Sequence, residues 1–195
     1  MKNIFTAQKT VLALAVAGLM SSGAFAAADS QIDNITIGEN GALVITGNAH
    51  NTAASAVATG NVTTGKDEGT IGKGQFAATT TGVNLTMNGG TLTVKADNSS
   101  TTGNNGALFL QELAFGDYTN TINVDATSRD STIVAKKGLD TSNGNVVLNF
   151  LGQPAEGSTS TAKIRTDDNQ AITLGGDDAL TTINVAAGTT ARIQA

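Results

Sequence analysis

Short runs of alternating apolar and polar residues recur along the chain, and each run ends at Gly, Asn or Asp. Thr, Val and Ile favour extended backbone, and alternation with a period of two places the apolar side chains on one face of a strand. Gly, Asn and Asp favour turns. The pattern therefore predicts short strands at residues 35–37, 43–45, 85–87, 92–94, 122–124, 133–134, 146–150, 172–174 and 183–185.

Two stretches depart from this pattern. Residues 49–82 are mostly Ala, Thr and Gly with few large apolar side chains, which predicts a long loop or a weakly packed excursion. Residues 107–115 (ALFLQELAF) carry five large apolar residues in nine. A run of this length is compatible with either a short helix or a buried strand, and we expect it to form a local core or a cap.

One string recurs inside the chain. Thr121–Ala126 (TINVDA) returns as Thr182–Ala187 (TINVAA), a pair that we call the TINV repeat, and a weaker repeat joins Asn34–Ile37 to Asn84–Met87. The spacing of the TINV repeat corresponds to three steps of about 20 residues, within the range of solenoid periods. The alternative is chance recurrence in a composition rich in Thr, Asn and Val. If the two copies are equivalent stacked strands, four side chains point into the core: Ile122, Val124, Ile183 and Val185.

The composition favours one β architecture over the others. Many short strands with small-residue turns are typical of a sandwich, a barrel or a parallel solenoid. Aromatic residues make up only 4 % of the chain and Trp is absent, whereas sandwich cores rely on large aromatic side chains. Solenoids stack aliphatic rows and Asn or Thr ladders, and Asn recurs beside the strands at positions 34, 84, 123, 145, 149 and 184. We therefore predict an all-β single-stranded parallel β-helix (β-solenoid), with a β-sandwich as the alternative.

The N-terminus has the three regions of a secretory signal peptide. Lys2 and Lys9 give a basic region, residues 11–20 (VLALAVAGLM) an apolar region, and residues 24–26 (Ala-Phe-Ala) a cleavage site. We predict cleavage between Ala26 and Ala27, which divides the chain into a signal peptide at 1–26 and one solenoid domain at 27–195. No later apolar run is long enough for a membrane helix, so the mature chain is predicted to be exported without a membrane span.

Charge and cysteine content exclude several classes of function. The net charge is -5, and removing Lys2 and Lys9 leaves nine basic against 16 acidic residues, a net charge of −7. That is the wrong sign for a nucleic-acid binder. The absence of cysteine excludes a disulfide framework, cysteine-ligated zinc and an iron–sulfur cluster.

Candidate catalytic residues are few. His50 is the only histidine, which excludes a catalytic triad or a multi-histidine metal site, and its polar surroundings predict a solvated loop residue. Gly176-Asp177-Asp178 matches an element of polygalacturonase-like β-helices, but their Asn-Thr-Asp, His-Gly and Arg-Ile-Lys elements are missing. The pairs Asp167-Asp168 and Asp177-Asp178 are therefore expected to be turn residues, and we predict no catalytic residue.

Calcium is the second interpretation of these acidic pairs, because Asp and Asn oxygens are suitable ligands. Residues 174–180 (LGGDDAL) form one poor copy of the calcium-binding nonapeptide repeat, and a single copy lacks the adjacent turn that completes a site. We expect weak, adventitious calcium binding at most. No metal-binding or cofactor-binding residue, and no cofactor, is predicted.

Three strings carry a resemblance to a known family: NITIGENGALVITG (34–47), NLTMNGGTLTV (84–94) and TINVAAGTTARI (182–193). With the leader and the Thr/Asn/Gly-rich body, they resemble passenger regions of bacterial autotransporters and related large adhesins. The resemblance implies a right-handed parallel β-helix outside a Gram-negative cell, associated with the outer membrane where a barrel anchors it. The chain lacks the C-terminal barrel of that family, so we expect a fragment of a longer chain rather than a short secreted relative.

The function expected from these features is that of a non-enzymatic, secreted or cell-surface structural or adhesive protein. Its expected partners are glycans or proteins of a host or a cell surface. A self-assembling extracellular fibre or surface-layer subunit is the alternative, since solenoid ends expose strand edges that pair between chains. A polysaccharide-degrading β-helix enzyme is the third interpretation.

Overall fold

The computed structural model describes residues 34–48, 54–64, 83–97, 105–152, 160–167 and 169–195. These residues form strands and turns and contain no helix, so the chain is an all-β protein. The larger sheet has the order β15–β12–β9–β7–β5–β1–β4, with bounds Thr190–Gln194, Thr161–Thr166, Ser131–Ala135, Gly106–Phe115, Val83–Asn88, Asn34–Gly38 and Val62–Thr64. The second has the order β14–β11–β8–β6–β2–β3, with bounds Thr181–Val185, Val146–Leu151, Asn120–Asp125, Thr91–Lys95, Ala42–Thr46 and Ser55–Thr59. A small third sheet pairs β10 (Leu139–Asp140) with β13 (Ile172–Thr173).

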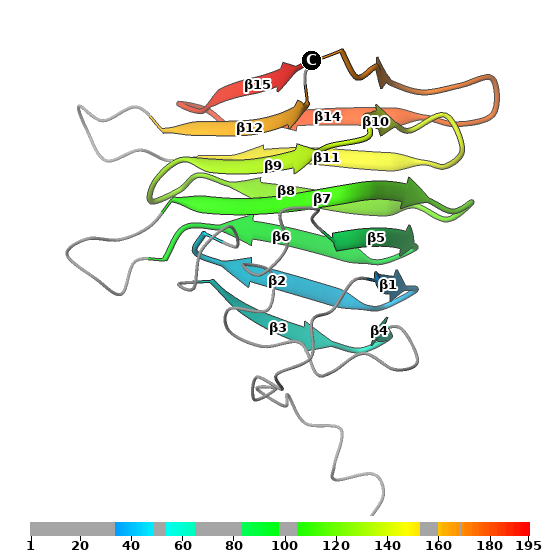
Figure 1. Ribbon diagram of the computed structural model, residues 1–195. Coiled ribbons are helices and arrows are strands. Elements are labelled where there is room, and N and C mark those ends of the chain that lie inside the picture. Colours follow the sequence, from blue (N-terminus) through cyan, green and yellow to red (C-terminus); the bar gives the residue numbers. More distant parts are fainter. Residues whose placement is uncertain (1–33, 49–53, 65–82, 98–104, 153–159, 168) are drawn as a thin grey trace, which may run out of the picture.

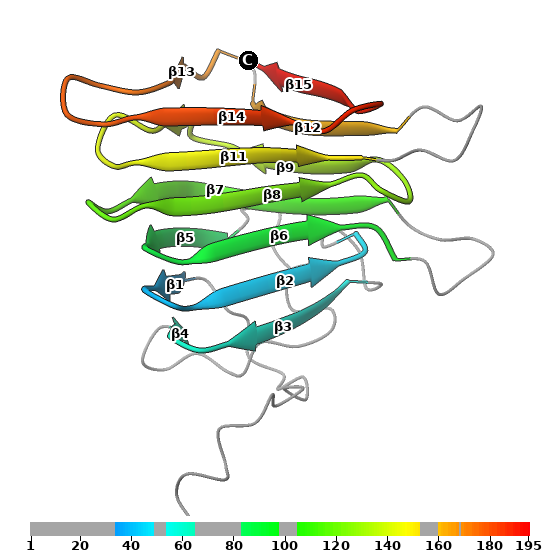
Figure 2. The same cartoon turned by 180° about the vertical axis from the view of Figure 1, so that it is seen from behind.

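The chain alternates between the two large sheets, so that successive strands form stacked layers (Figures 1 and 2). β1, β5 and β7 are each followed directly by a strand of the second sheet, and β9 and β12 are followed by β10 and β13 of the small sheet before the chain reaches it. All strand pairs are parallel except those of β3 with β2 and β4 with β1. The sheets are therefore mixed but mainly parallel, and each end strand pairs on one side only within the described ranges.

The TINV repeat spans two steps between neighbouring strands, so the three shorter steps expected from its spacing are wrong. Ile122 pairs with Leu148 in the first step, and Leu148 pairs with Ile183 in the second. Each step contains two long strands and the turns between them, and β10 or β13 lies within it, which makes the steps long and unequal. The two copies do lie in the same register of the same sheet.

The weaker repeat joins directly neighbouring strands. Asn34 pairs with Asn84 and Ile37 with Met87 in parallel register, and Asn84 Nδ2 donates a hydrogen bond to Asn34 Oδ1 over 3.1 Å. The spacing is large because β3 and β4 lie in the sequence between β2 and β5.

The segment 49–82 contains strands that the sequence did not indicate. β3 and β4 run antiparallel to β2 and β1 at one end of the stack, so a loop throughout this segment is wrong. The core-facing side chains of β3 are small: Ala56 and Ala58 are buried, as is Ala54 just before the strand. Residues 49–53 and 65–82 lie outside the described residues.

The core lies between the two large sheets and consists of rows of aliphatic side chains. One row of buried residues runs through Leu43, Leu92, Ile122 and Leu148, and the next through Ile45, Val94, Val124 and Phe150. Residues 107–115 belong to the strand β7, which resolves the choice between helix and strand. β7 supplies buried Leu108, Leu110, Leu113 and Phe115 to this core.

The two copies of the repeat occupy the same rows of side chains, as predicted, but the expected burial is found only for the first copy. Ile122 and Val124 are fully buried, whereas Ile183 and Val185 are about half exposed. β14 is the end strand of its sheet, and no described strand lies on its other side. No helix among the described residues is long and apolar enough to cross a membrane.

Candidate binding groove

A groove forms where β7 extends beyond its neighbour in the sheet. β9 pairs with β7 from Gly106 to Leu110 and ends at Ala135, whereas β5 pairs with β7 as far as Phe115. Lys136 N and Lys137 N still donate to Leu110 O and Gln111 O of β7, and the chain then turns away. From Glu112 onward, β7 therefore has a strand neighbour on one side only among the described residues.

Gly138 makes the turn that carries the chain from β9 into β10. Its N–H donates to Ala135 O over 3.1 Å, and its φ of 110° lies in the left-handed region that favours glycine. A Cβ at this position would lie 2.9 Å from Ala171 O. Leu139 N donates to the same oxygen over 3.1 Å, which holds β10 against β13. The groove wall therefore depends on a glycine at position 138.

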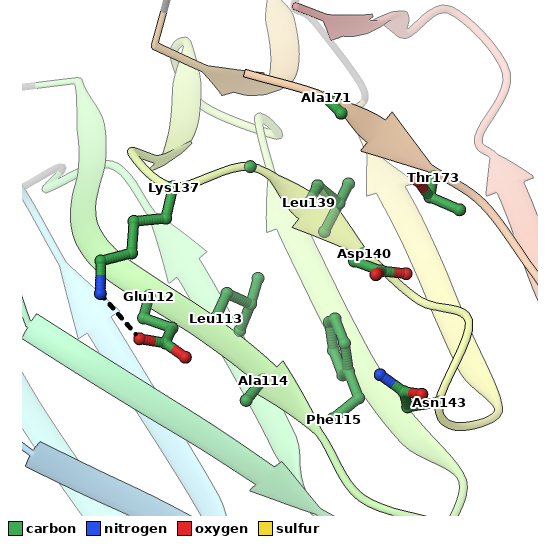
Figure 3. A pocket seen from close by; sticks show the side chains of 11 residues that line it. Glu112, Leu113, Ala114, Phe115, Lys137, Leu139, Asp140, Asn143, Ala171 and Thr173 are labelled. Atoms are coloured by element: carbon green, nitrogen blue, oxygen red, sulfur yellow. Dashed lines mark hydrogen bonds and ion pairs between the residues drawn. The ribbon is translucent and has the colours of Figure 1, made fainter.

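The groove has a volume of about 440 Å³ and lies between the second half of β7 and the β10–β13 pair (Figure 3). Its lining includes three buried apolar side chains, Leu113, Phe115 and Leu139. Its polar lining is mixed in character and consists of Glu112, Lys137, Asp140, Asn143 and Thr173. An apolar lining with donors and acceptors beside it is typical of sites for polar ligands.

Lys137 and Glu112 form an ion pair at the edge of the groove, with 3.0 Å between Nζ and Oε2. Both side chains are more than half exposed, so the pair contributes about 0–1 kcal/mol to stability. Lys137 lies in the turn before Gly138. The pairing with Glu112, on a distant part of the sequence, was not predicted.

Asp140 is held in its charged form. The pKa of its carboxyl group is lowered by a hydrogen bond from the Ser142 side chain and by one from the Ser142 backbone N–H, which lies 2.9 Å from Oδ1. A carboxyl group that acts as a general acid near neutral pH needs a raised pKa. The environment of Asp140 has the opposite effect and suits it to accepting hydrogen bonds.

A second hollow of about 250 Å³ lies beside the first and shares Asn143 with it. Its lining includes Asp117 and Asp178, together with Asn145, whose Oδ1 accepts a hydrogen bond from Leu180 N over 2.9 Å. Among the described residues, no group of three or more His, Cys, Asp or Glu side chains is arranged to hold a metal ion.

The described residues of the two acidic pairs follow different strands. Asp177 and Asp178 are exposed in a turn between β13 and β14, closed by a hydrogen bond of 3.0 Å from Gly176 N to Ala179 O. Asp167 follows β12, and Asp168 lies outside the described residues. His50 and the predicted cleavage residues Ala26 and Ala27 also lie outside them.

An uncharged polar ladder runs along the outer side of the second sheet. Asn123 Nδ2 donates to Thr93 Oγ1 over 3.1 Å, Asn149 Nδ2 to Asn123 Oδ1 over 2.8 Å, and Asn184 Nδ2 to Asn149 Oδ1 over 2.8 Å. These residues alternate with the buried aliphatic rows of the same strands. The ladder fixes the register of four neighbouring strands from outside the core.

Comparisons of the chain with protein-family models, curated proteins and solved structures found no match.

Proposed function

We propose that the chain is a β-solenoid segment of a secreted or cell-surface adhesive protein that resembles an autotransporter passenger and acts by binding rather than catalysis. The observation that carries this proposal is the combination of two rows on the same four strands. An aliphatic row continues from Leu92 to Ile183, and a hydroxyl–amide ladder continues from Thr93 to Asn184. Successive layers that repeat both rows in register are the arrangement expected of a solenoid.

The groove beside β7 supports a binding role for this scaffold. The carboxylate of Asp140, the amide of Asn143 and the hydroxyl of Thr173 provide acceptors and donors along the groove. Ala114 and Ala171 also line the groove and are not buried, so they offer apolar surface to the C–H face of a sugar ring. We therefore propose an extended glycan as the ligand of the groove.

A binding role also agrees with the electrostatics of the groove. The Ser142 hydrogen bonds lower the pKa of Asp140, so this carboxylate is not prepared to donate a proton to a leaving group. An extended scaffold gains affinity by repeating weak contacts along a polymer, without any chemical step.

The experiment that tests this function is a glycan-array screen of the purified chain, followed by calorimetry on the ligands it identifies. We expect the affinity to fall by about tenfold or more when Asp140 and Asn143 are both replaced by Ala, because polar groups of the bound ligand then lose their hydrogen-bond partners. Asp177→Ala, which removes one carboxylate from an exposed turn outside the groove, is the control and should leave binding unchanged.

Two results would contradict the proposal. Equal affinity in the groove variant and in the control would show that the ligand does not bind in the groove. Release of reducing sugar from a bound polymer, lost on Asp140→Asn, would make the chain an enzyme.

A further inference from the structure

The outer face of the larger sheet carries positive charge where β12 and β15 lie side by side (Figure 1). The core side chains of β12 include Ala162 and Ile164, which are fully buried. Lys163 and Arg165 alternate with them, so both side chains lie on the outer side of the sheet. On β15, Arg192 pairs in register with Lys163 and lies in the same outer row. We call Lys163, Arg165 and Arg192 the cationic patch.

No carboxylate lies beside Lys163 or Arg165 in the rows of the sheet. β12 has a described strand on either side, β9 and β15, so the neighbours of both residues within the sheet all belong to the described residues. These four in-register neighbours are three uncharged residues and one further cation: Thr132, Val134, Gln194 and Arg192.

Acidic residues stand at the ends of these strands rather than within the patch. Asp130 precedes β9, and its Oδ1 accepts a hydrogen bond from Thr161 N over 2.7 Å. Asp167 follows β12. Within the described part of the chain, neither carboxylate forms an ion pair with a residue of the cationic patch. The three cations are therefore without a paired counter-charge among the described residues.

This concentration of positive charge is unusual for the chain and unfavourable for the sheet. Outside the predicted leader there are nine basic and 16 acidic residues, yet three of the nine basic residues meet in the cationic patch. Like charges directly opposite each other on neighbouring strands destabilise a sheet. Lys163 and Arg192 are such a pair, on strands about 4.8 Å apart. An anionic ligand bound at this pair would remove the repulsion.

We propose that the cationic patch binds an acidic glycan, that is, a linear polysaccharide with sulfate or carboxylate groups. The guanidinium groups of Arg165 and Arg192 suit such groups, because each can donate two parallel hydrogen bonds to one anion. Lys163 lies one strand spacing from Arg192 and two residues, about 6.6 Å, from Arg165. The patch therefore fits anionic groups on successive sugar units. The inference does not rest on the groove beside β7 or on the ligand proposed for it.

Other anionic partners fit the patch less well. An anionic lipid surface is recognised by clusters of about four to eight Lys and Arg residues, and the patch has three. A nucleic acid duplex carries one charge about every 1.7 Å and would extend from the patch onto a chain of negative net charge. A sugar chain also carries hydroxyl groups, for which Thr132 and Gln194 beside the cations provide hydrogen-bond partners.

Calorimetric titration of the purified chain with dextran sulfate tests the proposal. We expect binding that unmodified dextran, the matched neutral polymer, does not displace. The affinity should fall as salt is added, because binding releases counterions from the polymer. Lys163→Gln should lower the affinity by about fivefold, and Lys163→Gln/Arg165→Gln should lower it by more than about tenfold. Polygalacturonate, titrated in the same way, distinguishes recognition of carboxylate from recognition of sulfate.

Lys95→Gln is the matched control. Lys95 is a partly buried, outward lysine of β6 in the second sheet, so its replacement changes the net charge by the same amount as Lys163→Gln. We expect it to leave the affinity for dextran sulfate unchanged. All of these side chains point away from the core, so far-UV circular dichroism should show an unchanged fold in every variant.

Several results would overturn the proposal. These are a lack of binding at low salt, displacement of dextran sulfate by unmodified dextran, and equal losses of affinity in Lys163→Gln and Lys95→Gln. Tighter binding of a DNA oligonucleotide or of anionic lipid vesicles, lost in Lys163→Gln/Arg165→Gln, would assign the cationic patch to a different class of partner.

Discussion

Ile183 pairs in register with Leu148, yet Leu148 is fully buried and Ile183 is 45 % exposed. Both side chains occupy the same row of the core, and both follow the same alternation along their strands. They differ because Leu148 has a layer on either side, β8 and β14, whereas β11 is the one described strand that neighbours Ile183. Burial in a stacked fold is therefore set by the number of neighbouring layers as well as by the direction of the side chain.

This difference predicts unequal losses of stability along one row. Ile122→Ala should lower the free energy of unfolding by about 2–5 kcal/mol, because it leaves a cavity in a closed core. Ile183→Ala should lower the free energy of unfolding by only about 1 kcal/mol, since about half of the side chain already contacts water. Urea melts of the two variants give both values. Equal losses would mean that the end layer is covered.

A matched outward residue provides the control for this series. Thr121 precedes Ile122 on β8 and points away from the core, so Thr121→Ala should change stability by about 0.5 kcal/mol. A loss as large as that of Ile122→Ala would show that the alternation along β8 is wrongly assigned.

Gly138→Ala should destabilise the chain by about 1–3 kcal/mol, because residue 138 has positive φ and the added Cβ meets Ala171 O. The same variant should also weaken ligand binding, since the turn places β10 against β13 beside the groove. Lys137→Ala, one residue earlier, removes an exposed ion pair and should cost only about 0.5 kcal/mol. Differential scanning calorimetry of thermal unfolding distinguishes the two variants. Similar losses of stability in both would contradict the role given to Gly138.

Asp140 should contribute stability that depends on pH in the acid range. Its folded-state pKa is lowered by the Ser142 hydrogen bonds, so its contribution is present above the unfolded-state pKa and is lost as the pH falls through the folded-state pKa. Ser142→Ala removes the hydroxyl donor and should raise the Asp140 pKa toward its usual value. NMR titration of the Asp140 carboxyl carbon measures this pKa, and an unchanged value would exclude the hydroxyl as its cause.

Export should remove the leader after Ala26, because residues 1–26 have the three regions of a signal peptide. N-terminal sequencing of the chain recovered outside the cytoplasm should begin at Ala27. Recovery of exported chain that still begins at Met1 would contradict this cleavage.

The strand positions were predictable where the pattern is local. Alternation around Ile122 and Val124 identified both the strand and its buried face, because period-two burial is encoded in neighbouring residues. The strand β3 was missed because its inward residues are Ala56 and Ala58, and small side chains give little contrast with their polar neighbours.

The groove was not predictable from the sequence, because it depends on relations between distant segments. It requires β7 to extend beyond the end of β9, and it requires Leu139 to pair with Ile172, which lies beyond β11 and β12 in the sequence. β10 is too short for any periodic signal, and the pattern that predicted a strand at 172–174 says nothing of its partner in the sheet. The exposure of Ile183 depends in the same way on which layers lie next to β14.

Cysteine cross-linking between layers tests the stacked parallel register most directly. Val147 pairs with Thr121 on one side and with Thr182 on the other. Neighbouring strands lie about 4.8 Å apart, within the Cα range of a disulfide, and alternate strands lie at about twice that distance. In this otherwise cysteine-free chain, we predict that the pairs Thr121→Cys/Val147→Cys and Val147→Cys/Thr182→Cys form intramolecular disulfides under mild oxidation, and that Thr121→Cys/Thr182→Cys does not. A link in the third pair without links in the first two would contradict the stacking of β8, β11 and β14.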